Sequence, residues 1–143
     1  AEMPNNLEKI NSLQVHMIIG FVVGLLTLIR IFVKKNHLPL EPLKVENEAR
    51  KKLIKVTHFA LYSLILLMVA SGVTLSIMSG LGEIVFFGSS APLPEDFSIY
   101  LPRKAHGIFA KVLFAFIGIH IVGVLLYKFK TDSSISKRMW FGK

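Results

Sequence analysis

Residues Ala105–Tyr127, AHGIFAKVLFAFIGIHIVGVLLY, form a long apolar run in which Lys111 is the one fixed charge. In a helix that rises about 1.5 Å per residue, roughly 20 apolar residues cross a bilayer core of about 30 Å. Val15–Val33 and Val56–Met78 are apolar runs that meet the same requirement. Because a backbone inside lipid must satisfy its own hydrogen bonds, each run is predicted to be a transmembrane helix.

The three runs predict an all-α transmembrane helical bundle that forms a single membrane domain over residues 1–143. The predicted spans cover about 13–34, 53–79 and 104–128. A shorter apolar patch, Ile84–Gly88, cannot span a bilayer and is expected at the interface. The loop 79–104 around it is expected to cap the outer end of the bundle.

The composition favours a membrane protein over a soluble enzyme. Of the 143 residues, 52% are hydrophobic and 18% are charged, whereas a soluble domain carries about 25% charged residues. The mean hydropathy is +0.57. The sequence has no cysteine, which excludes disulfides, thiolate metal sites, a cysteine nucleophile and covalent attachment of haem through C-x-x-C-H.

The net charge of +8 is distributed unevenly along the chain. The first connecting segment and the C-terminal tail hold most of the basic residues: Lys34, Lys35, Lys44, Arg50, Lys51, Lys52, Lys55, Lys128, Lys130, Lys137, Arg138 and Lys143. The positive-inside rule therefore predicts that this segment and the C-terminus are cytoplasmic. Because topology and anionic lipid explain the excess, no nucleic-acid partner is expected.

Four of the five histidines fall inside the predicted spans: His16, His58, His106 and His120. Ionisable side chains are costly within a bilayer and usually have a function there. A single intramembrane histidine is explained equally well by a hydrogen bond between helices. Four of them, in spans that contain no Asp or Glu, favour a metal-ligand role.

The spacing of His106 and His120 suggests two ligand levels. Fourteen residues of helix return to within roughly 40° of the starting direction and advance about 21 Å along the axis. Both imidazoles should therefore leave one helix face, too far apart for one metal ion but suited to two stacked cofactors. On the predicted topology, His16 is level with His106 near the outer end, and His58 is broadly level with His120 near the inner end.

Two glycines follow His16 on the same helix face, Gly20 and Gly24, four and eight positions later. Glycines beside a ligand would leave room for a large flat macrocycle. Small residues at this spacing also allow two helices to pack closely. The sequence leaves both interpretations open.

Two neutral imidazoles on opposite faces of a porphyrin fill both axial positions of its iron, which suits electron transfer rather than substrate binding. Without cysteine thioethers the cofactor would be haem b, in one or two copies. Arg30, near the inner end of its span, would either reach a lipid phosphate or pair with a haem propionate or a quinone oxygen.

The sequence resembles the bacterial cytochrome b561 family, which is related to the haem-bearing membrane subunits of nickel–iron hydrogenases and formate dehydrogenases. The second span carries His58-Phe59-Ala60-Leu61-Tyr62 and then Ser71-Gly72, similar to the family's third helix. The third span, with His106 and Gly118-Ile119-His120, and the tail Lys137-Arg138-Met139 are similar to its fourth helix. The first span, with His16 and Arg30, resembles its second helix.

The resemblance implies four helices, of which the first has no counterpart here. It also implies one haem between the histidines that match His16 and His106, and a second between a first-helix histidine and the one that matches His120. The missing ligand would come from a helix outside this sequence, from a second chain, or from His58. In the usual family arrangement, His58 is a polar neighbour of the inner haem and not an axial ligand.

These observations predict a membrane-bound b-type cytochrome that moves electrons between the quinone pool, ubiquinone or another quinone, and a redox partner protein or superoxide. No catalytic residue is assigned, and whether the chain is itself an oxidoreductase stays open. The alternative is a haem-free proton or metal-ion transporter, or an anchor subunit, that uses the intramembrane histidines. The lack of carboxylates in the spans counts against a transporter.

Overall fold

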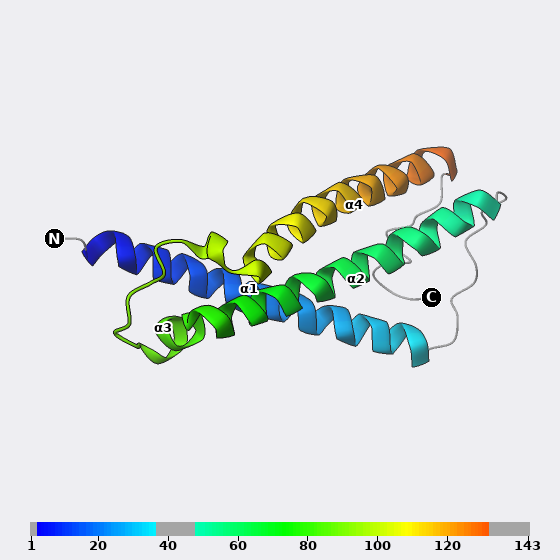
Figure 1. The fold of residues 1–143 in the computed structure, drawn as a ribbon. Helices are drawn as coiled ribbons and strands as arrows, with labels where there is room; N and C mark the ends of the chain where they lie inside the picture. Colours follow the sequence, from blue (N-terminus) through cyan, green and yellow to red (C-terminus); the bar gives the residue numbers. More distant parts are fainter. Residues whose placement is uncertain (1–2, 37–47, 132–143) are drawn as a thin grey trace.

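The fold is made entirely of helices in the part of the chain that the structure describes. This structure is a computed structural model, and it describes residues 3–36 and 48–131. The elements in chain order are α1 (Met3–Asn36), α2 (Glu48–Ser79), α3 (Leu81–Phe87), the 3-10 helix η1 (Phe97–Ile99) and α4 (Leu101–Thr131) (Figure 1). The described ranges contain no strand, and the predicted all-α class with three long apolar helices is confirmed.

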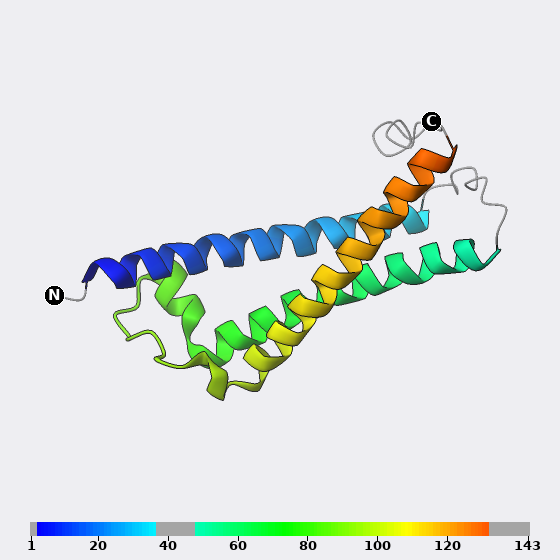
Figure 2. The same cartoon turned by 90° about the horizontal axis from the view of Figure 1, so that it is seen from above.

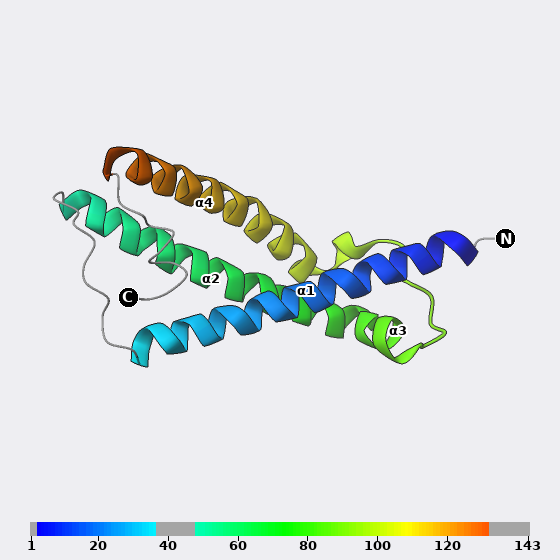
Figure 3. The same ribbon diagram turned by 180° about the vertical axis from the view of Figure 1, so that it is seen from behind.

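Helix α2 is the centre of the bundle, because α1, α3 and α4 all pack against it. In Figure 1, α2 runs in the opposite direction to both α1 and α4. The same view from behind shows α1 crossing α2 at an angle (Figure 3). Helices α1 and α4 therefore start at the same end of the bundle, which we call the α3 end.

The outer faces of the long helices suit a lipid environment. Three stretches are long and apolar enough to cross a membrane: Leu7–Asn36, Glu48–Ser79 and Leu101–Tyr127. Phe21, Phe59 and Phe114 on these helices are each at least 65% exposed. Exposing apolar surface to water costs about 25 cal/mol of free energy per Å². This cost is avoided where the surface contacts lipid tails.

A short helix with one buried face lies at the α3 end. Helix α3 lies between Gly80 and Gly88, both in the left-handed region at φ 67° and 66°, where a side chain would be strained. Its Leu81, Ile84 and Val85 are the buried apolar side chains among the described residues, and the helix contacts α1 and α2. The patch expected at the interface thus forms a helix packed on α1 and α2, and η1 packs against α4. Figure 2 shows α3 lying against α1.

Gly24 marks a close approach of α1 to α2. A Cβ atom built on Gly24 would lie 2.8 Å from Cγ2 of Val69, whereas one built on Gly20 would meet nothing within 4 Å. Gly24 therefore serves helix packing. Gly20 borders open space, which leaves the interpretation as room for a macrocycle available at that position.

We predict that Gly24→Ala lowers the stability of the helix bundle, because the added methyl overlaps a stiff valine. Overpacking of this kind costs about 1–3 kcal/mol of the free energy of unfolding. Thermal unfolding in detergent, followed by circular dichroism, measures the effect. Gly123→Ala is the matched control, because a Cβ atom there would meet nothing within 4 Å. An equal drop in both variants would contradict the proposed close approach.

Candidate cofactor site

The first histidine pair, His16 and His106, joins α1 to α4 toward the α3 end. The two ring centroids lie 6.0 Å apart with an interplanar angle of 71°. Bonds of about 2.0 Å from a metal to two opposed imidazole nitrogens hold the ring centroids about 6 Å apart. The first pair therefore has the separation that a single metal with two axial imidazoles requires.

The second histidine pair, His58 and His120, joins α2 to α4 farther from the α3 end. Its ring centroids lie 5.0 Å apart with an interplanar angle of 81°. The spacing of the two histidines along α4 places His106 at one level of the bundle and His120 at another. Because α2 runs antiparallel to α4, His58 near the start of α2 meets His120 and not His106. The second pair is closer than the first and would have to widen to admit a metal.

The His58 ring presents one nitrogen to a ligand. Its Nδ1 lies 2.8 Å from the carbonyl oxygen of Ile54 in the preceding turn. Since a carbonyl can only accept, Nδ1 donates its hydrogen, and the lone pair of the neutral ring stays on Nε2. A backbone contact of this kind commonly orients metal-binding histidines.

Arg30 lies near the second pair. Its Nε donates to the hydroxyl of Tyr62 over 3.0 Å, and the Tyr62 ring centroid lies 6.3 Å from that of His58. The ammonium of Lys34 stands 5.8 Å from the Tyr62 centroid. A guanidinium has several N–H donors, so Arg30 keeps donors for an anionic group or a quinone oxygen while bonded to Tyr62.

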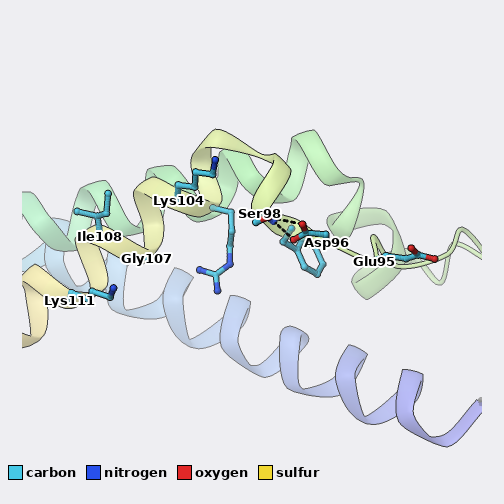
Figure 4. A pocket seen from close by; sticks show the side chains of 9 residues that line it. Glu95, Asp96, Ser98, Lys104, Gly107, Ile108 and Lys111 are labelled. Atoms are coloured by element: carbon cyan, nitrogen blue, oxygen red, sulfur yellow. Dashed lines mark hydrogen bonds between the residues drawn. The ribbon is translucent and has the colours of Figure 1, made fainter.

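A depression of about 650 Å³ lies at the start of α4, between η1 and the helix (Figure 4). Arg103, Lys104 and Lys111 line it together with Glu95 and Asp96. Among the described residues the only ion pair joins Lys51 to Glu48. Lys104 lies near enough to Asp96 to help lower the pKa of that carboxyl, but the three cations outnumber the two carboxylates of the depression by one. The depression is therefore a place where an anion would be attracted.

The Asp96 carboxylate in this depression is occupied by its own turn. Its Oδ1 accepts from the backbone amide of Ser98 over 2.7 Å and its Oδ2 from the Ser98 hydroxyl over 2.6 Å (Figure 4). The bond from the Ser98 hydroxyl has the larger effect and the bond from the amide the smaller, and both hold the pKa of Asp96 below its ordinary value. The turn caps the start of η1 and leaves Asp96 with less capacity to bind the nearby lysines.

The described residues contain no group of three or more His, Cys, Asp or Glu that could hold a metal ion. Each level offers two imidazoles. His37 and the tail Lys137-Arg138-Met139 lie outside the described residues. Two contacts were not foreseen from the sequence: the bond between Arg30 and Tyr62, and a bond between Ser71 and His106.

An all-α bundle with three membrane-crossing helices and two levels of paired histidines defines a class of multi-pass membrane protein suited to redox cofactors. The family model for prokaryotic cytochrome b561 matches residues 2–142, and the chain belongs to this family. Comparison with the curated proteins and with the solved structures found no match. Membership confirms the resemblance, identifies a membrane b-type cytochrome and implies that the chain binds haem b.

We predict that Ser98→Ala raises the pKa of Asp96 toward its ordinary value of about 4. The lowered pKa in the folded protein stabilises the fold above the pKa of the unfolded chain, and this stabilisation is lost as pH falls through the folded value. A ¹³C-carboxyl NMR titration measures the pKa. Ser90→Ala in the same loop is the control, and an unchanged Asp96 titration in Ser98→Ala would contradict the assignment.

Proposed function

We propose that the chain is an electron-transfer cytochrome that holds a haem b between His16 and His106. The observation that carries this proposal is the 6.0 Å separation of the two ring centroids from different helices. Each level has two imidazoles, and a haem iron takes its remaining ligands from the porphyrin. Gly20, one turn after His16, borders open space that would accommodate the edge of a macrocycle.

When bound, a haem with two axial imidazoles supplies a reversible Fe(II)/Fe(III) couple with no open coordination position. The residues of this chain do the rest. His16 and His106 fix the height of the cofactor between α1 and α4. His106 is half-buried and His16 is exposed, so lipid as well as protein would shield a bound haem from water. Because both ligands would stay in place, a change of oxidation state would require little rearrangement.

The second level is proposed to hold a further haem b on His120. His58 is the imidazole that this chain presents to it, with ring centroids 5.0 Å apart. Because that distance is shorter than in the first pair, either α2 and α4 separate slightly or the opposing ligand comes from another helix or a second chain. The haem content of single variants distinguishes these arrangements.

The two ends of the bundle suggest where electrons enter and leave. Near the second pair, Arg30 and Tyr62 offer donors to a quinone carbonyl or to a haem propionate. Near the first pair, the cations Arg103, Lys104 and Lys111 would attract an anionic reactant such as superoxide, or would guide a redox partner protein. We propose exchange between a quinone pool and one of these reactants.

The orientation in the membrane is proposed from the basic residues. Those in the described structure gather where α1 ends and α2 begins: Lys34, Lys35, Arg50, Lys51, Lys52 and Lys55. We propose that the protein lies in a bacterial inner membrane. The positive-inside rule puts this end of the bundle and the C-terminus on the cytoplasmic side of that membrane. The first histidine pair then lies toward the outer face.

We predict that His106→Ala and His16→Ala each remove one haem per chain, because neither remaining imidazole can hold the iron alone from both sides. The pyridine haemochrome assay on detergent-purified protein measures the haem-to-protein ratio. His37→Ala is the control and should leave it unchanged. Full retention of haem in His106→Ala would reject the ligand assignment, and a colourless wild-type protein that binds copper or zinc would favour a transporter.

The same assay tests the second level. If His58 is the opposing ligand, His58→Ala and His120→Ala each lose the same haem and leave the first one intact. If the opposing ligand comes from elsewhere, His120→Ala loses that haem and His58→Ala keeps it. A wild-type ratio of one, unchanged in His120→Ala, would remove the second haem from the proposal.

A further inference from the structure

Ser71 differs from the other buried polar side chains of the bundle. Thr27, Thr57 and Ser71 are the buried polar residues among those that the structure describes. The hydroxyls of Thr27 and Thr57 each donate to a carbonyl of their own helix over 2.8 Å. The hydroxyl of Ser71 bonds its own helix and also a histidine ring of another helix, at Nδ1 of His106 over 2.9 Å.

The direction of these bonds follows from the number of hydrogens. The Ser71 hydroxyl has one hydrogen, and the carbonyl oxygen of Met68, 3.0 Å away, accepts it. The hydroxyl oxygen is then left with lone pairs toward His106, so Nδ1 of the ring is the donor over 2.9 Å. A neutral imidazole with its hydrogen on Nδ1 has its lone pair on Nε2.

The ring of His106 is also held from the side. A Cβ atom built on Gly72 would lie 3.4 Å from Cε1 and 3.7 Å from Nδ1 of His106, so the ring rests close to the backbone of α2. Ser71 fixes the tautomer while the bare backbone at Gly72 permits the approach. Together they leave Nε2 as the nitrogen available to face His16.

We infer that Ser71 is a positioning residue that fixes His106 in the Nδ1–H tautomer and thereby makes Nε2 the iron ligand. This inference rests on the proposed haem between His16 and His106. A hydrogen bond donated by Nδ1 makes the imidazole a stronger electron donor, which favours Fe(III) over Fe(II). Ser71 therefore lowers the midpoint potential of that haem. The Met68 carbonyl also faces the His106 ring, and on the other level the His58 ring donates to the Ile54 carbonyl.

The first arm of the test measures the redox potentials of three variants of the full-length, haem-loaded protein. Ser71→Ala is expected to raise the midpoint potential of one haem and to weaken its binding by about 10–100-fold. Ser71→Thr keeps a hydroxyl at the same helix position and should restore the wild-type potential. Ser79→Ala is the matched control, because the Ser79 hydroxyl donates to its own helix at Leu75. No shift in Ser71→Ala, or an equal shift in Ser79→Ala, would overturn the inference.

The second arm reads the tautomer directly. The method is ¹⁵N NMR of histidine-labelled protein, which is reduced so that any iron with two imidazole ligands is diamagnetic. The wild-type spectrum should show a protonated, hydrogen-bonded Nδ1 on His106. In Ser71→Ala the signal of the hydrogen bond should be lost. This signal does not require haem. A protein without haem but with this signal would defeat the proposed function and keep the hydrogen bond, whereas a haem-loaded protein with His106 protonated on Nε2 would overturn the role of Ser71 alone.

Discussion

The antiparallel packing of α4 on α2 is the contact on which both histidine levels depend. The sequence separation of His106 and His120 on α4 equals that of His58 and Gly72 on α2. Since the helices run in opposite directions, His120 meets His58 at one level and His106 meets the backbone of Gly72 at the other. A shift of one helical turn, about 5.4 Å, would separate both sets at once.

The apolar surroundings explain why the polar groups gather at these levels. An unpaired polar group in a bilayer is costly, and the described structure has no buried side-chain nitrogen or oxygen without a partner. Helix-borne hydroxyls use their own carbonyls, while Ser71, His106 and the pair of Arg30 with Tyr62 bond between helices. The interhelical bonds therefore occur where the histidines are, and they orient groups that would otherwise have several rotamers.

Much of this arrangement could be predicted from the sequence, because it follows from helical periodicity. Span lengths and the shared face of His106 and His120 need only the rise and the angle per residue. The level of His16 needs, in addition, the alternating direction of successive spans. Contacts that depend on the distance between two helices could not be predicted from the sequence. Gly24 on Val69, and the 5.0 Å between His58 and His120, depend on crossing angles that no single helix encodes.

An anomalous-difference map at the iron absorption edge, from crystals of the haem-loaded protein, tests the central claim most directly. We expect a peak of iron density between Nε2 of His16 and Nε2 of His106, with the porphyrin edge passing Gly20. Iron absent from that position, with the two rings turned away from each other toward lipid, would contradict a cofactor held between α1 and α4.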